Sequence, residues 1–170
     1  MKIRAVFFGV GVLAMNVVPP YGHVEDHLPH LRELLDAYIE LANPRRIAWL
    51  GQRYINQVTI EFAERLAPGR LFNLAPAIPE ARALMHPGMT VQLESARTDA
   101  TSALTTLALS AKTPSAAVYT LDIYGRTSGQ VPNSAQSIVD WHSGTHEIII
   151  EAFLSSITDE ARKRFKERTP

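Results

Sequence analysis

Residues 90–124 read TVQLESARTDATSALTTLALSAKTPSAAVYTLDIY. Within this stretch, apolar and polar residues alternate in three runs, at 90–96, 104–111 and 116–124. Alternation of this kind is typical of strands that bury one face. The connections between the runs are too short for a parallel crossover, which needs a dozen or more residues. The stretch therefore predicts three consecutive antiparallel strands.

The segments around this meander predict one further long strand and two amphipathic helices. Residues 46–62 alternate like a strand, whereas apolar residues follow a helical period in 26–43. A second helix begins at Asn133 or Ser134, either of which can cap it. Residues 63–88, between the long strand and the meander, contain four prolines. This pattern predicts a crossing loop with a short helix at 80–85.

This element order predicts an α+β fold. We expect an antiparallel sheet of about five strands with two amphipathic helices packed on one face. Residues 1–160 should form a single domain, and 161–170 a basic, frayed tail.

The N-terminus can be interpreted in two ways. Basic residues at 1–4 followed by the apolar run 5–18 resemble a signal peptide. However, Pro19-Pro20-Tyr21 stands where a cleavage site would be needed, and the run is too short to cross a bilayer as a helix. A strand that ends at the Pro-Pro turn explains the same residues. We therefore expect a strand, a cytoplasmic protein and no membrane association.

Composition excludes several classes of chemistry. The 170 residues contain 17 basic and 17 acidic residues and no cysteine. Disulfides, thiolate metal sites and cysteine nucleophiles are therefore absent from the sequence. The balanced charge gives no global attraction to nucleic acid. Neither a G-x-S-x-G elbow nor a complete glycine-rich phosphate loop occurs.

Polar residues on two of the expected strands form the candidate ligand site. Asp122 interrupts an otherwise apolar strand, and Arg53 lies in the long strand. A carboxylate and a guanidinium on neighbouring strands either bind a ligand or form a structural ion pair. The full candidate set is Arg53, Tyr54, Asn56, Asp122 and Tyr124, with the 63–88 loop as a lid.

Histidine spacing gives a weak metal signal. His142 and His146 are four residues apart, so a helix would place both imidazoles on one face. No glutamate completes an H-E-x-x-H pattern around them, and helix packing explains them more simply. We expect no metal and no cofactor.

Several short motifs together resemble a known family. They are Pro20-Tyr21, LGQRYINQV at 50–58, TLDIY at 120–124, Trp141-His142, EAF at 151–153 and ITDE at 157–160. In order and content they are similar to a sporadically distributed prokaryotic family of hypothetical proteins. Members of that family have an L-G-L-R-Y-I-N-R-I-like strand and an I-T-D-E-like helix end. This chain differs at Gln52 and Thr120, and members are usually longer at the N-terminus.

The family has no established activity, and its patchy distribution implies mobile or defence-associated genes. The absence of a convergent catalytic set favours a non-enzymatic binding or interaction module. Such a module would be one member of a two-gene toxin–antitoxin or defence-type system, with a protein partner or a homo-oligomeric state. The alternative is a small-ligand-binding protein or enzyme with a pocket between sheet and helices.

Overall fold

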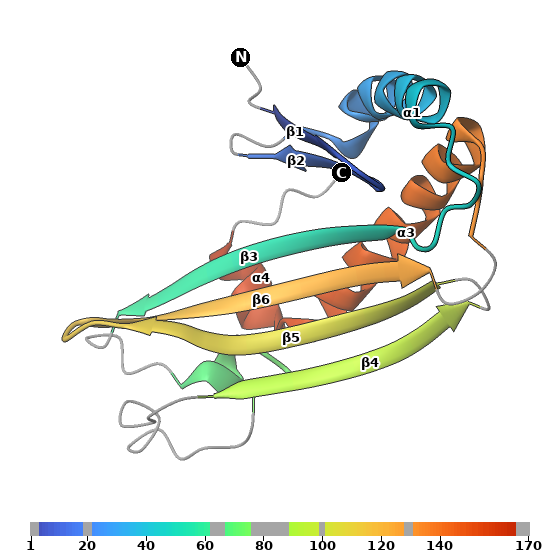
Figure 1. The fold of residues 1–170 in the computed structure, drawn as a ribbon. Coiled ribbons are helices and arrows are strands. Elements are labelled where there is room, and N and C mark those ends of the chain that lie inside the picture. The colour runs from blue at the N-terminus through green and yellow to red at the C-terminus, as the bar shows by residue number, and fades with distance from the viewer. Residues whose placement is uncertain are drawn as a thin grey trace.

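A computed structural model describes residues 4–18, 22–61, 67–75, 89–98, 101–127 and 131–165. The chain is α+β, with two separate antiparallel sheets. Four long strands form the larger sheet, in the order β3-β6-β5-β4, and two short strands, β1 and β2, form the smaller one (Figure 1).

The larger sheet confirms the meander. Its strands are β3 (Gly51–Glu61), β4 (Thr90–Thr98), β5 (Thr101–Lys112) and β6 (Ala116–Thr127). β4 pairs with β5 and β5 pairs with β6, in chain order, and β3 completes the sheet by pairing with β6. The β3–β6 register is continuous, whereas each of the other two pairs has one irregularity.

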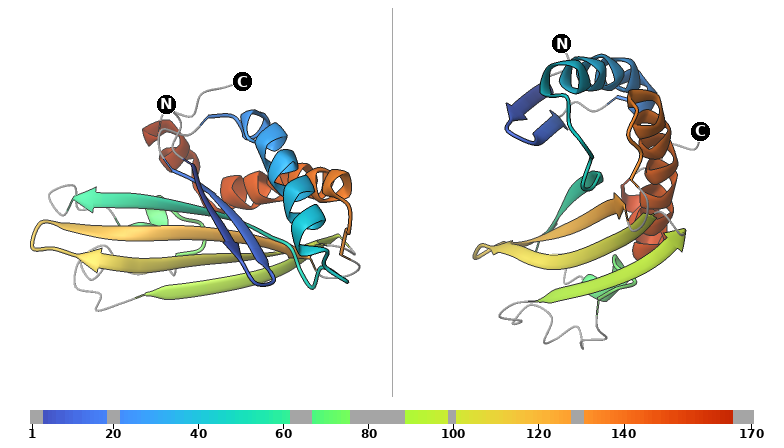
Figure 2. Two further views of the ribbon diagram at one scale, coloured as in Figure 1. Left: turned by 45° about the horizontal axis from the view of Figure 1, so that its top comes forward. Right: turned by 45° about the vertical axis from the view of Figure 1, so that its right-hand side comes forward.

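Helix α3 (Ala135–Ser156) covers one face of the larger sheet (Figure 2). Ser134 caps it by accepting a hydrogen bond from the Ser137 N–H. Alternate residues of β5 and β6, among them Leu107, Leu121 and Ile123, are buried beneath the helix with its Ile149. No described helix lies on the opposite face of the sheet, which faces the viewer in Figure 1.

Part of the proline-rich segment is anchored in this core. Leu71 and Phe72 follow the short 3-10 helix η3 (Pro68–Arg70) and are almost fully buried. The Asn73 side chain donates hydrogen bonds to the carbonyls of Ser155 and Ile157, at 2.9 and 3.0 Å. Residues 67–75 therefore do not behave as the expected lid. The short helix expected at 80–85 lies outside the described residues.

The chain after α3 turns into one more short helix. Thr158 accepts a hydrogen bond from the Ala161 N–H and so caps α4 (Asp159–Arg164). Ala161 is fully buried, so the segment expected as a tail begins inside the core. Residues 166–170 lie outside the described ranges.

The apolar N-terminal run forms a hairpin, so the prediction of one strand was wrong. β1 (Arg4–Gly9) and β2 (Val12–Val17) pair in antiparallel register. Gly11 has a φ of 78°, a conformation that costs glycine little, and this allows the chain to reverse. The six strands in two sheets replace the expected single sheet of about five.

The position of the first helix also corrects the prediction. α1 (Leu28–Ala42) packs against the hairpin and the first turns of α3, away from the face of the larger sheet (Figure 2). Leu31 and Leu35 form a second apolar cluster with Ala135 and Ile138. Of the two predicted helices, α3 covers the larger sheet and α1 does not.

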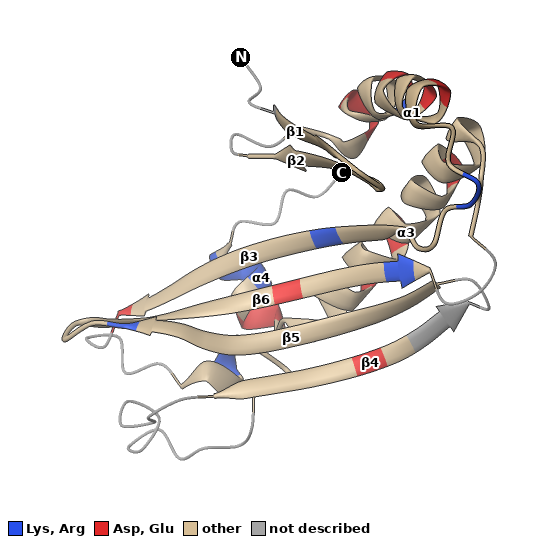
Figure 3. Ribbon diagram, viewed as in Figure 1, with Lys and Arg blue, Asp and Glu red and all other residues tan. Residues whose placement is uncertain are grey.

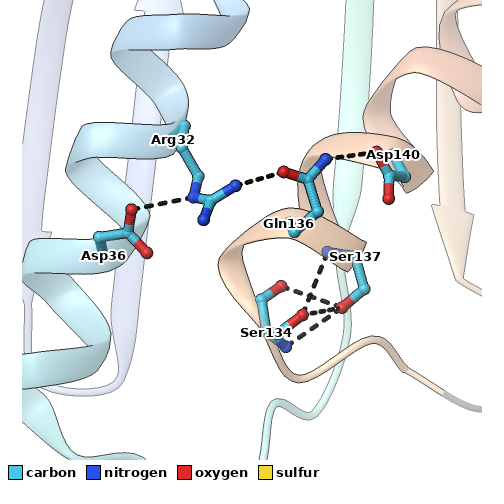
Figure 4. A network of polar contacts seen from close by, with 6 residues as sticks. All are labelled: Arg32, Asp36, Ser134, Gln136, Ser137 and Asp140. Carbon is cyan, nitrogen blue, oxygen red and sulfur yellow. Dashed lines mark hydrogen bonds and ion pairs between the residues drawn. The ribbon is translucent and has the colours of Figure 1, made fainter.

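A polar network at the surface joins these two helices (Figure 4). Arg32 donates hydrogen bonds to Asp36 on its own helix and to Gln136 on α3. Gln136 in turn donates to Asp140, at 2.7 Å. Exposed pairs of this kind stabilise only slightly, so the apolar cluster carries most of the contact energy between the helices.

Candidate functional site

Two of the predicted site residues form an ion pair on the open face of the larger sheet. Arg53 Nε donates to both oxygens of Asp122, at 2.9 and 3.1 Å, and Arg53 Nη2 donates to Oδ2. The side chain of Arg53 is 58% exposed and that of Asp122 is 18% exposed. The hydrogen bond to Asp122 raises the pKa of Arg53. This forked contact occupies both carboxylate oxygens, so Asp122 has little capacity left for a ligand.

Tyr124 lies on the same face but covers the backbone of the edge strand. A Cβ built on Gly51 would lie 2.5 Å from the Tyr124 hydroxyl and 2.9 Å from the Trp49 ring. Glycine at this position allows both aromatic rings to approach the strand closely. Tyr124 therefore packs on the backbone beside the ion pair.

Two further charged side chains described near this end of the open face also form a pair. Arg126 on β6 donates to Glu94 on β4, at 2.5 Å, and to the hydroxyl of Ser102 on β5, at 3.3 Å. Figure 3 shows these as isolated basic and acidic positions along the strands of the larger sheet. The Arg53–Asp122 pair thus joins the neighbouring strands β3 and β6, whereas Arg126 reaches across β5 to Glu94 on β4.

Tyr54 lies on the opposite, helix-covered face. Its hydroxyl is 2.7 Å from Nδ1 of His146 on α3 and accepts a hydrogen bond from Gln52 Nε2 at 3.2 Å. Burial raises the pKa of Tyr54, and the negative charge of Glu25 raises it further, whereas the Gln52 hydrogen bond lowers it. Gln52 is only 9% exposed, and its Oε1 has no hydrogen-bond partner within the described part of the chain.

Asn56 also lies on the helix side, where its amide donates to the Leu121 carbonyl at 3.4 Å. The five predicted site residues therefore divide between two faces. Arg53, Asp122 and Tyr124 lie together on the open face, and Tyr54 and Asn56 lie behind them. Successive side chains of a strand point to opposite faces, so Arg53 and Tyr54 cannot share one binding surface.

The two candidate metal ligands have separate surroundings on α3. His146 contacts Tyr54, whereas the ring of His142 packs edge-on against Trp141, with 5.1 Å between ring centroids. Burial lowers the pKa of His142 to about 4. Within the described ranges, no group of three or more His, Asp or Glu side chains is placed to hold a metal ion.

The hairpin exposes a surface that the sequence reasoning did not assign to function. Phe7 is 59% exposed, Phe8 54% and Val12 48%. The register places Phe7 opposite Ala14 and Gly9 opposite Val12, so Phe7 and Val12 share the face directed away from α1. Among the described residues, half of the large exposed hydrophobic side chains lie between 7 and 18: Phe7, Phe8, Val10, Val12 and Val18.

The hairpin carries no charge along this surface. The sequence from Ala5 to Gly22 contains no Asp, Glu, Lys, Arg or His, and Figure 3 shows the hairpin uncoloured by charge. This uncharged run was the available signal, and it was interpreted as a single strand that ends at the Pro-Pro turn. Exposed apolar surface of this kind is typical of interaction sites.

Comparisons with family models, curated proteins and solved structures found no match. Among the described helices, none has the length and apolar character needed to span a membrane. The fold and its surfaces therefore define a two-sheet α+β protein with an exposed apolar hairpin.

Proposed function

We propose that this protein is a non-enzymatic interaction module that binds a protein partner through the outer face of its β1–β2 hairpin. The observation that carries the proposal is the exposure of Phe7 and Val12 on a two-stranded ribbon that has no charged residue from Ala5 to Val17. Aromatic side chains contribute disproportionately to protein interfaces. An isolated two-stranded hairpin is marginally stable in water, so a partner on its free face would also stabilise it.

The open face of the larger sheet is a less suitable binding surface than the hairpin, because four of its charged residues are already paired with one another. Arg53 and Asp122 bind each other, as do Arg126 and Glu94. A partner that used these groups would have to replace existing ion pairs, whereas binding at Phe7 only removes apolar surface from water. An apolar groove or helix face with few charges would suit the hairpin.

The family resemblance adds a proposal about which gene encodes the partner. A member of a two-gene toxin–antitoxin or defence-type system would have its partner encoded next to it. The resemblance remains a prediction, and the neighbouring gene product is the first partner to examine.

The test is co-expression of the tagged protein with the product of the neighbouring gene, followed by purification at fixed stoichiometry. A variant with Phe7→Ser and Val12→Ser should lose the partner while keeping its circular dichroism spectrum. Leu41→Ser is the matched control, because Leu41 is an exposed hydrophobic residue on α1. A protein that purifies alone from its native host and turns over a small molecule would contradict the proposal.

A second candidate function rests on the cluster around Tyr54. A buried amide oxygen without a partner is costly, and a small ligand with an N–H or O–H donor would satisfy Gln52 Oε1. Binding there should raise the melting temperature of the wild type and not of Gln52→Leu. A single ordered water in a crystal structure at this position would account for the amide without a ligand.

A further inference from the structure

Among the described residues, no strand pairs with the outer edge of β3. β3 is the terminal strand of the larger sheet, and β1 and β2 pair only with each other. The continuous β3–β6 register contains no bulge, and β3 contains no proline. Natural sheets usually protect such edges with bulges, prolines or charges. The opposite edge strand, β4, has a register irregularity between Ala96 and Thr98.

The direction of the free backbone groups follows from the ladder. The Thr127 N–H donates to the Leu50 carbonyl at 3.1 Å, which makes these two residues a hydrogen-bonded pair. Hydrogen-bonded and non-hydrogen-bonded pairs alternate in antiparallel sheets. The even-numbered residues of β3 therefore bond to β6, and the odd-numbered residues direct their N–H and C=O groups outward.

The odd-numbered residues of β3, which direct their backbone groups outward, are complementary to the same residues of a second β3 strand running antiparallel. This row has Arg53 near one end, Glu61 at the other and the uncharged residues Ile55, Gln57 and Thr59 between them. If two copies pair antiparallel with Gln57 opposite Gln57, Arg53 of each copy faces Glu61 of the other. Arg53 contacts Asp122 through Nε and Nη2, so it can face Glu61 through Nη1 without giving up that ion pair. Ile55 then faces Thr59, and like charges are not opposed.

We propose that β3 pairs antiparallel with β3 of a second copy of this chain, with Gln57 on the two-fold axis. The contact is isologous and closes at two copies. It joins the two larger sheets into one continuous sheet and satisfies the outward N–H and C=O groups of both edges. The proposal uses a different surface from the hairpin and does not depend on the proposed function.

Proline substitution tests the edge while sparing the fold. Gln57→Pro removes an outward N–H and no bond to β6, so it should convert a dimer into a monomer with an unchanged circular dichroism spectrum. Gln92→Pro is the matched control. The Leu109 N–H donates to the Met89 carbonyl, and the same alternation therefore directs the Gln92 N–H outward from β4. This control should remain dimeric.

Two further variants keep the proposal testable if Gln57→Pro fails to fold. Glu61→Arg places two arginines opposite each other at both ends of the interface, and should weaken dimerisation by about tenfold. Gln57→Cys supplies a single thiol in a chain without cysteine. Opposed Cα atoms at a hydrogen-bonded pair lie about 5.5 Å apart, within disulfide range, so mild oxidation should link two copies.

The measurements are sedimentation equilibrium over a range of concentrations and non-reducing electrophoresis after oxidation. Gln92→Cys serves as the control for random collision and should cross-link much more slowly than Gln57→Cys. A wild type that stays monomeric at high micromolar concentration, or equal cross-linking of the two variants, would overturn the proposal. Neither result would affect partner binding at Phe7 and Val12.

Discussion

At the scale of single residues, His142 is a group held in its neutral form by burial. Its ring packs against Trp141, and burial lowers its pKa from the ordinary 6.5 to about 4. The unfolded chain therefore takes up a proton at this residue before the folded chain does. Between those two pKa values, acidification favours unfolding.

We expect the unfolding free energy to fall as the pH drops below about 6.5, and this loss to level off below about 4. The full shift corresponds to about 3 kcal/mol. Urea titrations at a series of pH values give the unfolding free energy at each pH. The slope of this free energy against pH should be smaller for His142→Gln than for the wild type. Identical slopes for the two proteins would show that His142 is not the responsible group.

The sequence placed Arg53 and Asp122 on neighbouring strands but left open whether they bind a ligand or each other, and which face of the sheet they share. Alternation fixes that Arg53 and Tyr54 lie on opposite faces, and only the position of α3 decides which face is covered. The partner of Tyr54 is His146, a residue far away in sequence. Contacts of that kind depend on the tertiary packing of α3, which no local pattern contains.

At the scale of elements, α3 approaches the sheet closely at Gly125. A Cβ on this residue would overlap Thr145 Cγ2, and Thr145 is 1% exposed. Glycine here lets helix and strand pack without an intervening side chain.

Gly125→Ala should therefore destabilise the protein by about 1–3 kcal/mol through overpacking. Thr145→Ser removes the methyl group that the new Cβ would meet, so the double variant should recover much of the loss. Thermal unfolding of both single variants and the double variant gives the coupling energy. Additive effects of the two substitutions would argue against a direct contact.

Element boundaries were predictable where the alternation was strict, as in the meander. The prediction of a single strand for the N-terminal run was wrong because its apolar residues occupy both strands of a hairpin. The chain reverses at only two residues, Val10 and Gly11. The burial of Phe72 was not predicted, for a different reason. Phe72 lies between prolines in a segment without periodicity, and its burial comes from contact with the end of α3.

At the scale of the whole molecule, the protein has two apolar clusters connected by α3. One lies between α3 and the larger sheet, and the other contains Leu31, Leu35, Ala135 and Ile138. A smaller cluster under a two-stranded ribbon should open more readily than a four-stranded sheet.

Hydrogen exchange should therefore divide the chain into two units. Leu35→Ala, which costs about 2–5 kcal/mol, should speed exchange in α1 and the hairpin and leave β5 and β6 protected. Leu121→Ala should speed exchange in both units, because it weakens the central sheet. Equal loss of protection everywhere in Leu35→Ala would show one cooperative unit instead.

The packing of the hairpin beside the start of α3 has a consequence during synthesis. The ribosome releases β2 more than a hundred residues before it releases Ile138, which belongs to the cluster that Leu13 and Met15 pack against. Throughout that interval the nascent hairpin lacks its contacts with α3, and its exposed aromatic residues are available to chaperones or to neighbouring chains. Translation speed through the sheet region should consequently influence the yield of soluble protein.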